Sequence, residues 1–166
     1  MSTAFIFLSH FSIVAYALVG GVFLAFSDFI MRSLALTSGQ GGVEAMQVIN
    51  REVFRWVFMA LFLGLAPVSL FLAGYGLFGL SGTVGTVIAL AGLVYVVGCF
   101  GVTVFFNVPM NEALARMETS SNTTLDYWRQ TYLPRWTFWN SVRTVACMTS
   151  SGLLLVGIFL MAQMNR

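Results

Sequence analysis

Three long stretches of the chain carry no charged side chain, and the polar residues gather between them. These stretches are residues 1–27, 56–111 and 144–165. A helix needs about 20 apolar residues to cross a hydrocarbon core roughly 30 Å thick. The first stretch is long enough for one crossing, and the second is long enough for two crossings joined by a turn at Ser81–Thr83. The third stretch provides the fourth crossing. The pattern predicts spanning helices near residues 3–29, 54–80, 84–106 and 136–162.

The apolar runs are continuous and lack the period-two alternation of barrel strands, so they favour helices. Only 8% of the residues are charged, compared with roughly 25% in soluble domains. A soluble fold could not cover its surface with so few charges. We therefore expect an all-α integral membrane four-helix bundle, one domain over residues 1–166, whose first partner is the lipid bilayer.

Charge and cysteine usage exclude several other classes of protein. The net charge of +2 comes from mixed signs without a basic stripe, so nucleic-acid binding is not expected. Cys99 and Cys147 lie inside apolar runs without CxxC spacing, which argues against a zinc module. The chain has a single histidine, His10, so a metal site within one chain has at most one imidazole.

The arginines are distributed unequally between the two ends of the predicted bundle. Four crossings place both termini on one side and loops 31–52 and 107–135 on the other. Seven of the eight arginines lie in or beside those loops, and only Arg166 lies on the terminal side. The positive-inside rule predicts cytoplasmic loops and termini on the opposite side. Glycines within the spans favour close helix packing, which makes a homo-oligomer plausible.

Polar residues also collect at the end of the predicted bundle that carries loops 31–52 and 107–135, which we call the loop end. Asn107 and Asn111 are four residues apart, with Pro109 as an expected first residue of a short helix. Residues 125–132 are rich in Trp and Tyr and predict a short interfacial helix between spans three and four. After it, Trp136, Asn140 and Arg143 are spaced to share one helix face.

In the first loop, Gln47 and Asn50 share a face leading into the second span, and Arg32 lies at the end of the first. Two interpretations of this polar set remain open. The residues either cap helices and bind lipid headgroups, or they form a polar pocket beneath an aromatic lid, since buried amides and guanidinium groups need partners.

Two ionisable residues of the first span have alternative interpretations. Asp28 and Arg32 are spaced i, i+4 and form either a local ion pair or a carboxylate facing the pocket beside its arginine. His10 lies five turns before Asp28 and is expected on the packing face, near the level of Tyr75. It would either make a hydrogen bond to Tyr75 or a carbonyl, or act as a haem ligand or proton acceptor.

Four motifs together resemble the bacterial anthrone oxygenase-like membrane family. They are the run at residues 20–27 followed by Met31, Arg32 and Leu34; Ala45-Met46-Gln47 with Ile49 and Asn50; Asn107-Val108-Pro109-Met110-Asn111 with Leu114; and Trp136 with Asn140 and Arg143. The resemblance covers roughly residues 17–157. It implies a bacterial inner-membrane protein related to fungal enzymes that oxidise anthrones to anthraquinones with O₂. The sequence departs from those enzymes at Met110, where they usually carry Thr.

The resemblance implies an oxygenase-like enzyme that acts on a small hydrophobic aromatic or quinol-like molecule. In this hypothesis Arg143, Asn111 and Asn140 stabilise an enolate oxygen, and Asp28 is the nearest base. Substrate-binding positions would be Trp136, Asn107, Gln47, Asn50 and Arg32. The enzyme would work without a cofactor, or with haem on His10. The alternatives are a non-catalytic haem- or quinone-binding bundle and a structural membrane subunit.

Overall fold

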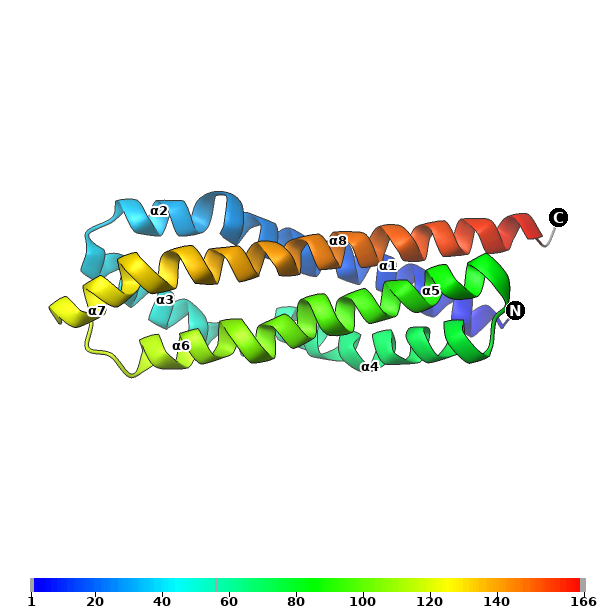
Figure 1. The fold of residues 1–166 in the computed structure, drawn as a ribbon, viewed down its shortest axis with the longest axis horizontal. Coiled ribbons are helices and arrows are strands. Elements are labelled where there is room, and N and C mark those ends of the chain that lie inside the picture. The colour runs from blue at the N-terminus through cyan, green and yellow to red at the C-terminus, as the bar shows by residue number, and fades with distance from the viewer. Residues whose placement is uncertain (1, 56, 165–166) are drawn as a thin grey trace.

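The computed structural model describes residues 2–55 and 57–164, and all the elements in them are helical (Figure 1). Short π-helical segments, labelled η, interrupt the α-helices. In chain order the elements are α1 (Thr3–Ala25), η1 (Phe26–Ile30), α2 (Met31–Leu36), α3 (Gly39–Glu52), α4 (Val57–Phe78), α5 (Gly82–Tyr95), η2 (Val96–Gly101), η3 (Thr103–Asn107), α6 (Val108–Ala115), α7 (Asn122–Tyr127), η4 (Trp128–Tyr132) and α8 (Leu133–Met164).

Within the described residues, four continuous helices are long and apolar enough to cross a membrane. They cover Thr3–Leu36, Val57–Phe78, Gly82–Ala115 and Asn122–Met164. These four helices confirm the expected four-helix membrane bundle, although three of them are longer than predicted. The predicted turn at residues 81–83 is also confirmed, because α4 ends at Phe78 and Gly82 begins α5 with a φ of 65°. Such a positive φ strains residues that carry a Cβ.

The short helices expected between spans three and four are present as α6 and α7, but they are not separate from the spans. α6 continues η3, and α7 joins α8 through η4. Pro109 lies in the first turn of α6, as predicted. The interfacial helix at residues 125–132 was expected to be separate from the fourth span, yet the chain stays helical from one to the other, through Pro134. The π-helical turn that precedes α8 alters the local hydrogen bonding, and this accommodates the missing amide hydrogen.

The lengths of the helices indicate where the loop end lies. α4 has 22 residues, so its length of about 33 Å matches the hydrocarbon core. The other three long helices continue past the beginning of α4, and α3 packs beside them at the same end (Figure 1). Both termini lie at the opposite end. Which end faces the cytoplasm stays a prediction, and Arg166 lies outside the described residues.

The bundle is tightest between α4 and α5. A Cβ built on Gly76 would lie 2.5 Å from the backbone nitrogen of Ala89 and 2.6 Å from the carbonyl oxygen of Gly85. Only glycine allows the two backbones to approach this closely. By contrast, a Cβ on Gly74 would have no neighbour within 4 Å.

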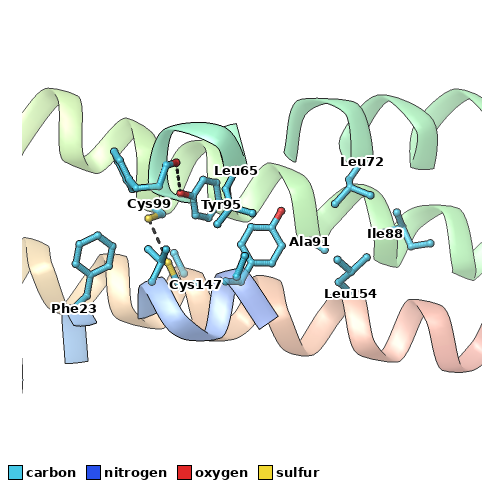
Figure 2. Close-up of a cluster of buried hydrophobic side chains, with 14 of the residues drawn as sticks. Phe23, Leu65, Leu72, Ile88, Ala91, Tyr95, Cys99, Cys147 and Leu154 are labelled. Carbon is cyan, nitrogen blue, oxygen red and sulfur yellow. Dashed lines mark hydrogen bonds between the residues drawn. The ribbon is translucent and has the colours of Figure 1, made fainter. Parts of the chain in front are cut away.

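The interior of the membrane-spanning half is mostly apolar (Figure 2). Figure 2 shows Cys99 of η2 facing Cys147 of α8, and the thiol of Cys147 donates to the sulfur of Cys99 at 3.3 Å. Nearby, the Tyr95 hydroxyl donates to the carbonyl of Phe62 at 2.8 Å. The two cysteines are therefore part of the apolar core.

A second, aromatic cluster fills the loop end. Its buried members come from α2, α3, α6, η4 and α8 and are Met31, Val43, Met46, Leu114, Trp128, Tyr132 and Trp136. The rings of Trp128, Tyr132 and Trp136 stack in order along one side of the fourth long helix. This stack fixes the orientation of the helix face that carries the polar residues described next.

Candidate functional site

A cavity of about 90 Å³ lies where the aromatic cluster meets the membrane-spanning half. Its lining comes from α1, η1, α3, α4, η3, α6 and α8 and is mainly apolar. Four of the polar residues predicted for the site line it, namely Asn50, Asn111, Trp136 and Arg143. The structure therefore brings these four residues together around one cavity, with the aromatic cluster on its loop side.

Arg143 is the one charged side chain among the lining residues. Its guanidinium lies 4.1 Å from the ring centroid of Phe23 and 5.3 Å from that of Trp136. Nη1 donates to Thr103 Oγ1 at 3.3 Å and Nη2 to Asn140 Oδ1 at 2.6 Å, while Nε has no hydrogen-bond partner. Only 5% of the residue is exposed.

The buried guanidinium of Arg143 has no acidic partner among the residues that the structure describes. Among the described residues, the ion pairs are Arg55–Glu52 and Arg116–Glu112, both between exposed side chains. Phe23 packs against Phe58 in the first turn of α4, and Phe58 lines the same cavity as Arg143, so the guanidinium lies near the end of the membrane-spanning part of the bundle. A cation this close to the hydrocarbon is costly unless an anion or strong acceptor binds it.

Asn140 connects Arg143 to the first helix. Its Nδ2 donates to the carbonyl of Phe23 and to Ser27 Oγ, each at 2.6 Å, and its Oδ1 accepts from Arg143. Ser27 also accepts from the Ser141 hydroxyl at 2.9 Å. Asn140 is fully buried and does not line the cavity. It therefore positions Arg143 rather than presenting an atom to a ligand.

A second set of hydrogen bonds holds the opposite wall. Asn111 Oδ1 accepts from both the Tyr132 hydroxyl and Trp136 Nε1, each at 2.7 Å. The Tyr132 hydroxyl in turn accepts from Asn50 Nδ2 at 3.3 Å. The oxygen of Asn111 is thus occupied, and its amide nitrogen is the group left to act as a donor.

The remaining predicted amides support the site from outside the cavity. Gln47 Nε2 donates to the carbonyls of Leu114 and Met117 at 2.8 and 3.0 Å, which ties α3 to the end of α6. Asn107 Nδ2 donates to the carbonyl of Trp136 at 3.2 Å, and its buried Oδ1 has no partner. Both residues were predicted to bind substrate, but the structure gives them helix-positioning hydrogen bonds.

The structure separates Asp28 and Arg32 from the cavity. Both side chains are exposed, neither lines the cavity, and they form no ion pair within the described residues. The expectation that Asp28 faces the pocket as a base is therefore not met, nor is the expectation of a local ion pair. One reason for their outward position is the π-helical turn η1, which includes Asp28 and follows the packing face of α1. A π-helical turn changes the direction in which the side chains after it point.

His10 also faces outward. It was expected on the packing face, but it is exposed, and its Nδ1 lies 2.8 Å from the carbonyl oxygen of Ile6, one turn earlier. Gly21 is exposed as well and has space around it, whereas a Cβ on Gly20 would lie 3.0 Å from Cys147 Cβ. The packing face of α1 therefore includes Gly20, and His10 is remote from the cavity.

Sequence reasoning missed three residues that complete the site. Phe23 and Thr103 hold the guanidinium, and Tyr132 joins Asn50 to Asn111. Each was detectable, because each lies four residues before a residue of the network: Ser27, Asn107 and Trp136. On a helix that spacing places two residues on one face.

The site combines one buried cation and a free amide donor with aromatic walls. No carboxylate or imidazole is present among the residues that line the cavity. Such an arrangement has the chemistry to stabilise an oxygen anion on a flat apolar molecule, since the donors are fixed in place and surrounded by low-dielectric material.

Comparison with known protein families gives one match. The family model described as anthrone oxygenase matches residues 51–153, which include Asn107, Asn111, Trp136, Asn140 and Arg143. Neither the curated proteins nor the solved structures gave a match to this chain.

Proposed function

The chain belongs to the anthrone oxygenase family, and on that premise we propose that it is a membrane-embedded oxygenase. Its substrate is a small hydrophobic aromatic molecule that can form an enolate or phenolate, and its oxidant is O₂. The observation that carries the proposal is Arg143, a buried guanidinium that lines a mainly apolar cavity without an acidic partner among the described residues.

The chemistry can be written for an anthrone, the substrate implied by the family description. Loss of one proton from the methylene carbon gives an enolate whose oxygen lies against Arg143. The electron-rich carbon reacts with O₂, and the resulting hydroperoxide loses water. One oxygen atom becomes the new carbonyl, and the other leaves as water with the two methylene hydrogens. The overall change is anthrone plus O₂ to anthraquinone plus water, so no further reductant is needed.

In this mechanism the protein stabilises the anion and positions its rings. Arg143 and the free amide hydrogens of Asn111 stabilise the enolate oxygen, while Trp136 and Phe23 form walls for the rings. Asp28 is not assigned as the base, because it is exposed outside the cavity. The proton passes to water at the interfacial end, and the buried cation favours this transfer by lowering the energy of the anion.

The volume of the cavity and its opening to the surface limit the size of the substrate and its route of entry. A cavity of about 90 Å³ is smaller than the ~150 Å³ that holds one benzene molecule. A fused-ring substrate therefore requires side chains to move. Exposed Val22 and Phe54 are part of the lining, so the cavity reaches the outer surface between α1 and the start of α4. We propose that substrate arrives there from the bilayer.

The proposal can be tested with anthrone as the probe. Detergent-purified wild-type protein should accelerate anthraquinone formation and O₂ consumption over protein-free micelles. Arg143→Met should reduce the acceleration by about 10²–10³-fold, whereas Arg116→Gln, which changes an exposed arginine at the loop end, should retain it. No acceleration by the wild-type protein, or equal acceleration by Arg143→Met, would refute the proposed function.

A further inference from the structure

A separate groove lies on the outer surface of the loop end, between α2 and the beginning of α8. Its lining combines two arginines, Arg32 and Arg129, with apolar side chains that include Leu133 and Phe138. The two arginines come from different helices, and both are exposed. The groove shares no lining residue with the cavity that contains Arg143, although Ser27, which lines the groove, accepts a hydrogen bond from Asn140.

Neither arginine has a carboxylate partner in residues 2–55 and 57–164. Within the described part of the chain, the ion pairs belong to Arg55 and Arg116, although Asp28 and Asp126 are close to Arg32 and Arg129 in sequence. Arg129 also points toward the first turn of α3, because a Cβ on Gly39 would lie 3.2 Å from Arg129 Nη2. The beginning of a helix carries partial positive charge, so this guanidinium lies beside a second positive feature. The region attracts an anion.

The charged and apolar parts of the groove follow one another along the bundle axis. Arg32 lies five residues, or about 7 Å, beyond Ser27 toward the loop end. On the antiparallel helix, Arg129 lies nine residues before Phe138, again toward the loop end. Phe23, one turn before Ser27, packs against Phe58 in the first turn of α4, where the hydrocarbon core ends by the length argument above. The arginines therefore lie at headgroup depth, with the apolar part nearer the hydrocarbon.

We propose that this groove binds an anionic phospholipid. The phosphate lies between Arg32 and Arg129, and one acyl chain runs along Leu133 and Phe138 toward the membrane interior. Basic grooves between helices at headgroup depth are suited to such lipids, because the charge pairs with phosphate while the apolar wall excludes water. A free phosphate ion would use only the arginines and leave the apolar wall unoccupied.

Native mass spectrometry of the detergent-purified full chain tests this inference. We expect dioleoyl phosphatidylglycerol to stay bound at an activation energy in the mass spectrometer that removes dioleoyl phosphatidylcholine. The double variant Arg32→Gln/Arg129→Gln should weaken phosphatidylglycerol binding about thirtyfold, and each single variant about fivefold, from the usual contribution of a basic residue near anionic lipid. The side chains are exposed, so these variants should fold normally.

A matched control removes the same number of charges elsewhere at the loop end. Arg55→Gln/Arg116→Gln should keep the preference for phosphatidylglycerol. The inference is overturned if the wild type shows no preference between the two lipids, if Arg32→Gln/Arg129→Gln keeps it, or if the control loses it equally. Displacement of the lipid by excess inorganic phosphate would identify a free-anion site and would also overturn the assignment.

Discussion

Asn140 and Arg143 form a hydrogen bond of 2.6 Å across one turn of α8, between Asn140 Oδ1 and Arg143 Nη2. Both side chains are buried, and the other end of the asparagine binds Phe23 and Ser27 of the first long helix. The amide therefore holds a cation in place without neutralising it. A carboxylate in the same position would form an ion pair with the guanidinium and compete with an anionic ligand.

Arg143→Met should lower turnover of the preferred substrate by about 10²–10³-fold, the usual effect of removing one oxyanion donor. The free energy of unfolding should fall little or rise, because a buried cation without a carboxylate partner is costly. Turnover and denaturant titration in detergent micelles check both expectations. A marked loss of stability with normal turnover in the folded fraction would instead assign the residue a structural role.

Asn140→Ala should lower both stability and turnover. The Phe23 carbonyl keeps a backbone donor, so loss of the Asn140 bond to it costs about 0.5–1.5 kcal/mol, and Arg143 loses its shortest hydrogen bond. The control is Asn122→Ala, an exposed asparagine at the start of α7. Both variants are compared by unfolding in micelles and by initial rates. Wild-type values for Asn140→Ala would show that the network does not position Arg143.

Tyr132→Phe should lower the free energy of unfolding by about 1 kcal/mol or slightly more, because the Tyr132 hydroxyl joins Asn50 to Asn111. Asn111 keeps its bond from Trp136, so the wall should persist and turnover should fall only a few-fold. Tyr127→Phe serves as a control, because Tyr127 packs on Tyr132 but takes no part in this network. Equal changes in stability and turnover in the two variants would show that the hydrogen bonds of Tyr132 to Asn50 and Asn111 contribute nothing.

Gly76→Ala should destabilise the bundle by about 1–3 kcal/mol, because the added methyl group meets the backbone of α5. Gly74→Ala, two residues away on the same helix, meets no atom within 4 Å and should be neutral or stabilise by up to about 1 kcal/mol. Thermal unfolding in one detergent compares the pair. Equal stability of the two variants would contradict the close α4–α5 packing.

The distribution of charges was sufficient to predict the four spans, since uncharged stretches of this length have few other structural solutions. The face formed by Trp136, Asn140 and Arg143 was also predictable, because polar residues stand out in an otherwise apolar helix. The spacing of these three residues then places their side chains on one face of the helix. The helix lengths were underestimated, because polar residues beyond the membrane end a hydropathy signal without ending the helix.

The orientation of the first span was not predictable in the same way. α1 is apolar around its whole circumference, so hydrophobic periodicity gives no direction. The structure packs Gly20 against Cys147 and leaves Gly21 exposed, and His10 and Asp28 are exposed as well. The π-helical turn at Phe26–Ile30 adds a change of direction for which the sequence carries no recognised signal.

The central claim is that Arg143 stabilises an oxygen anion on a flat aromatic ligand. The most direct measurement is the absorption spectrum of anthrone bound to the purified protein under nitrogen, where oxidation cannot follow. The account predicts an enolate band in the wild type at a pH where free anthrone is neutral, and loss of that band in Arg143→Met. An equal enolate fraction in the two proteins, both with anthrone bound, would contradict it.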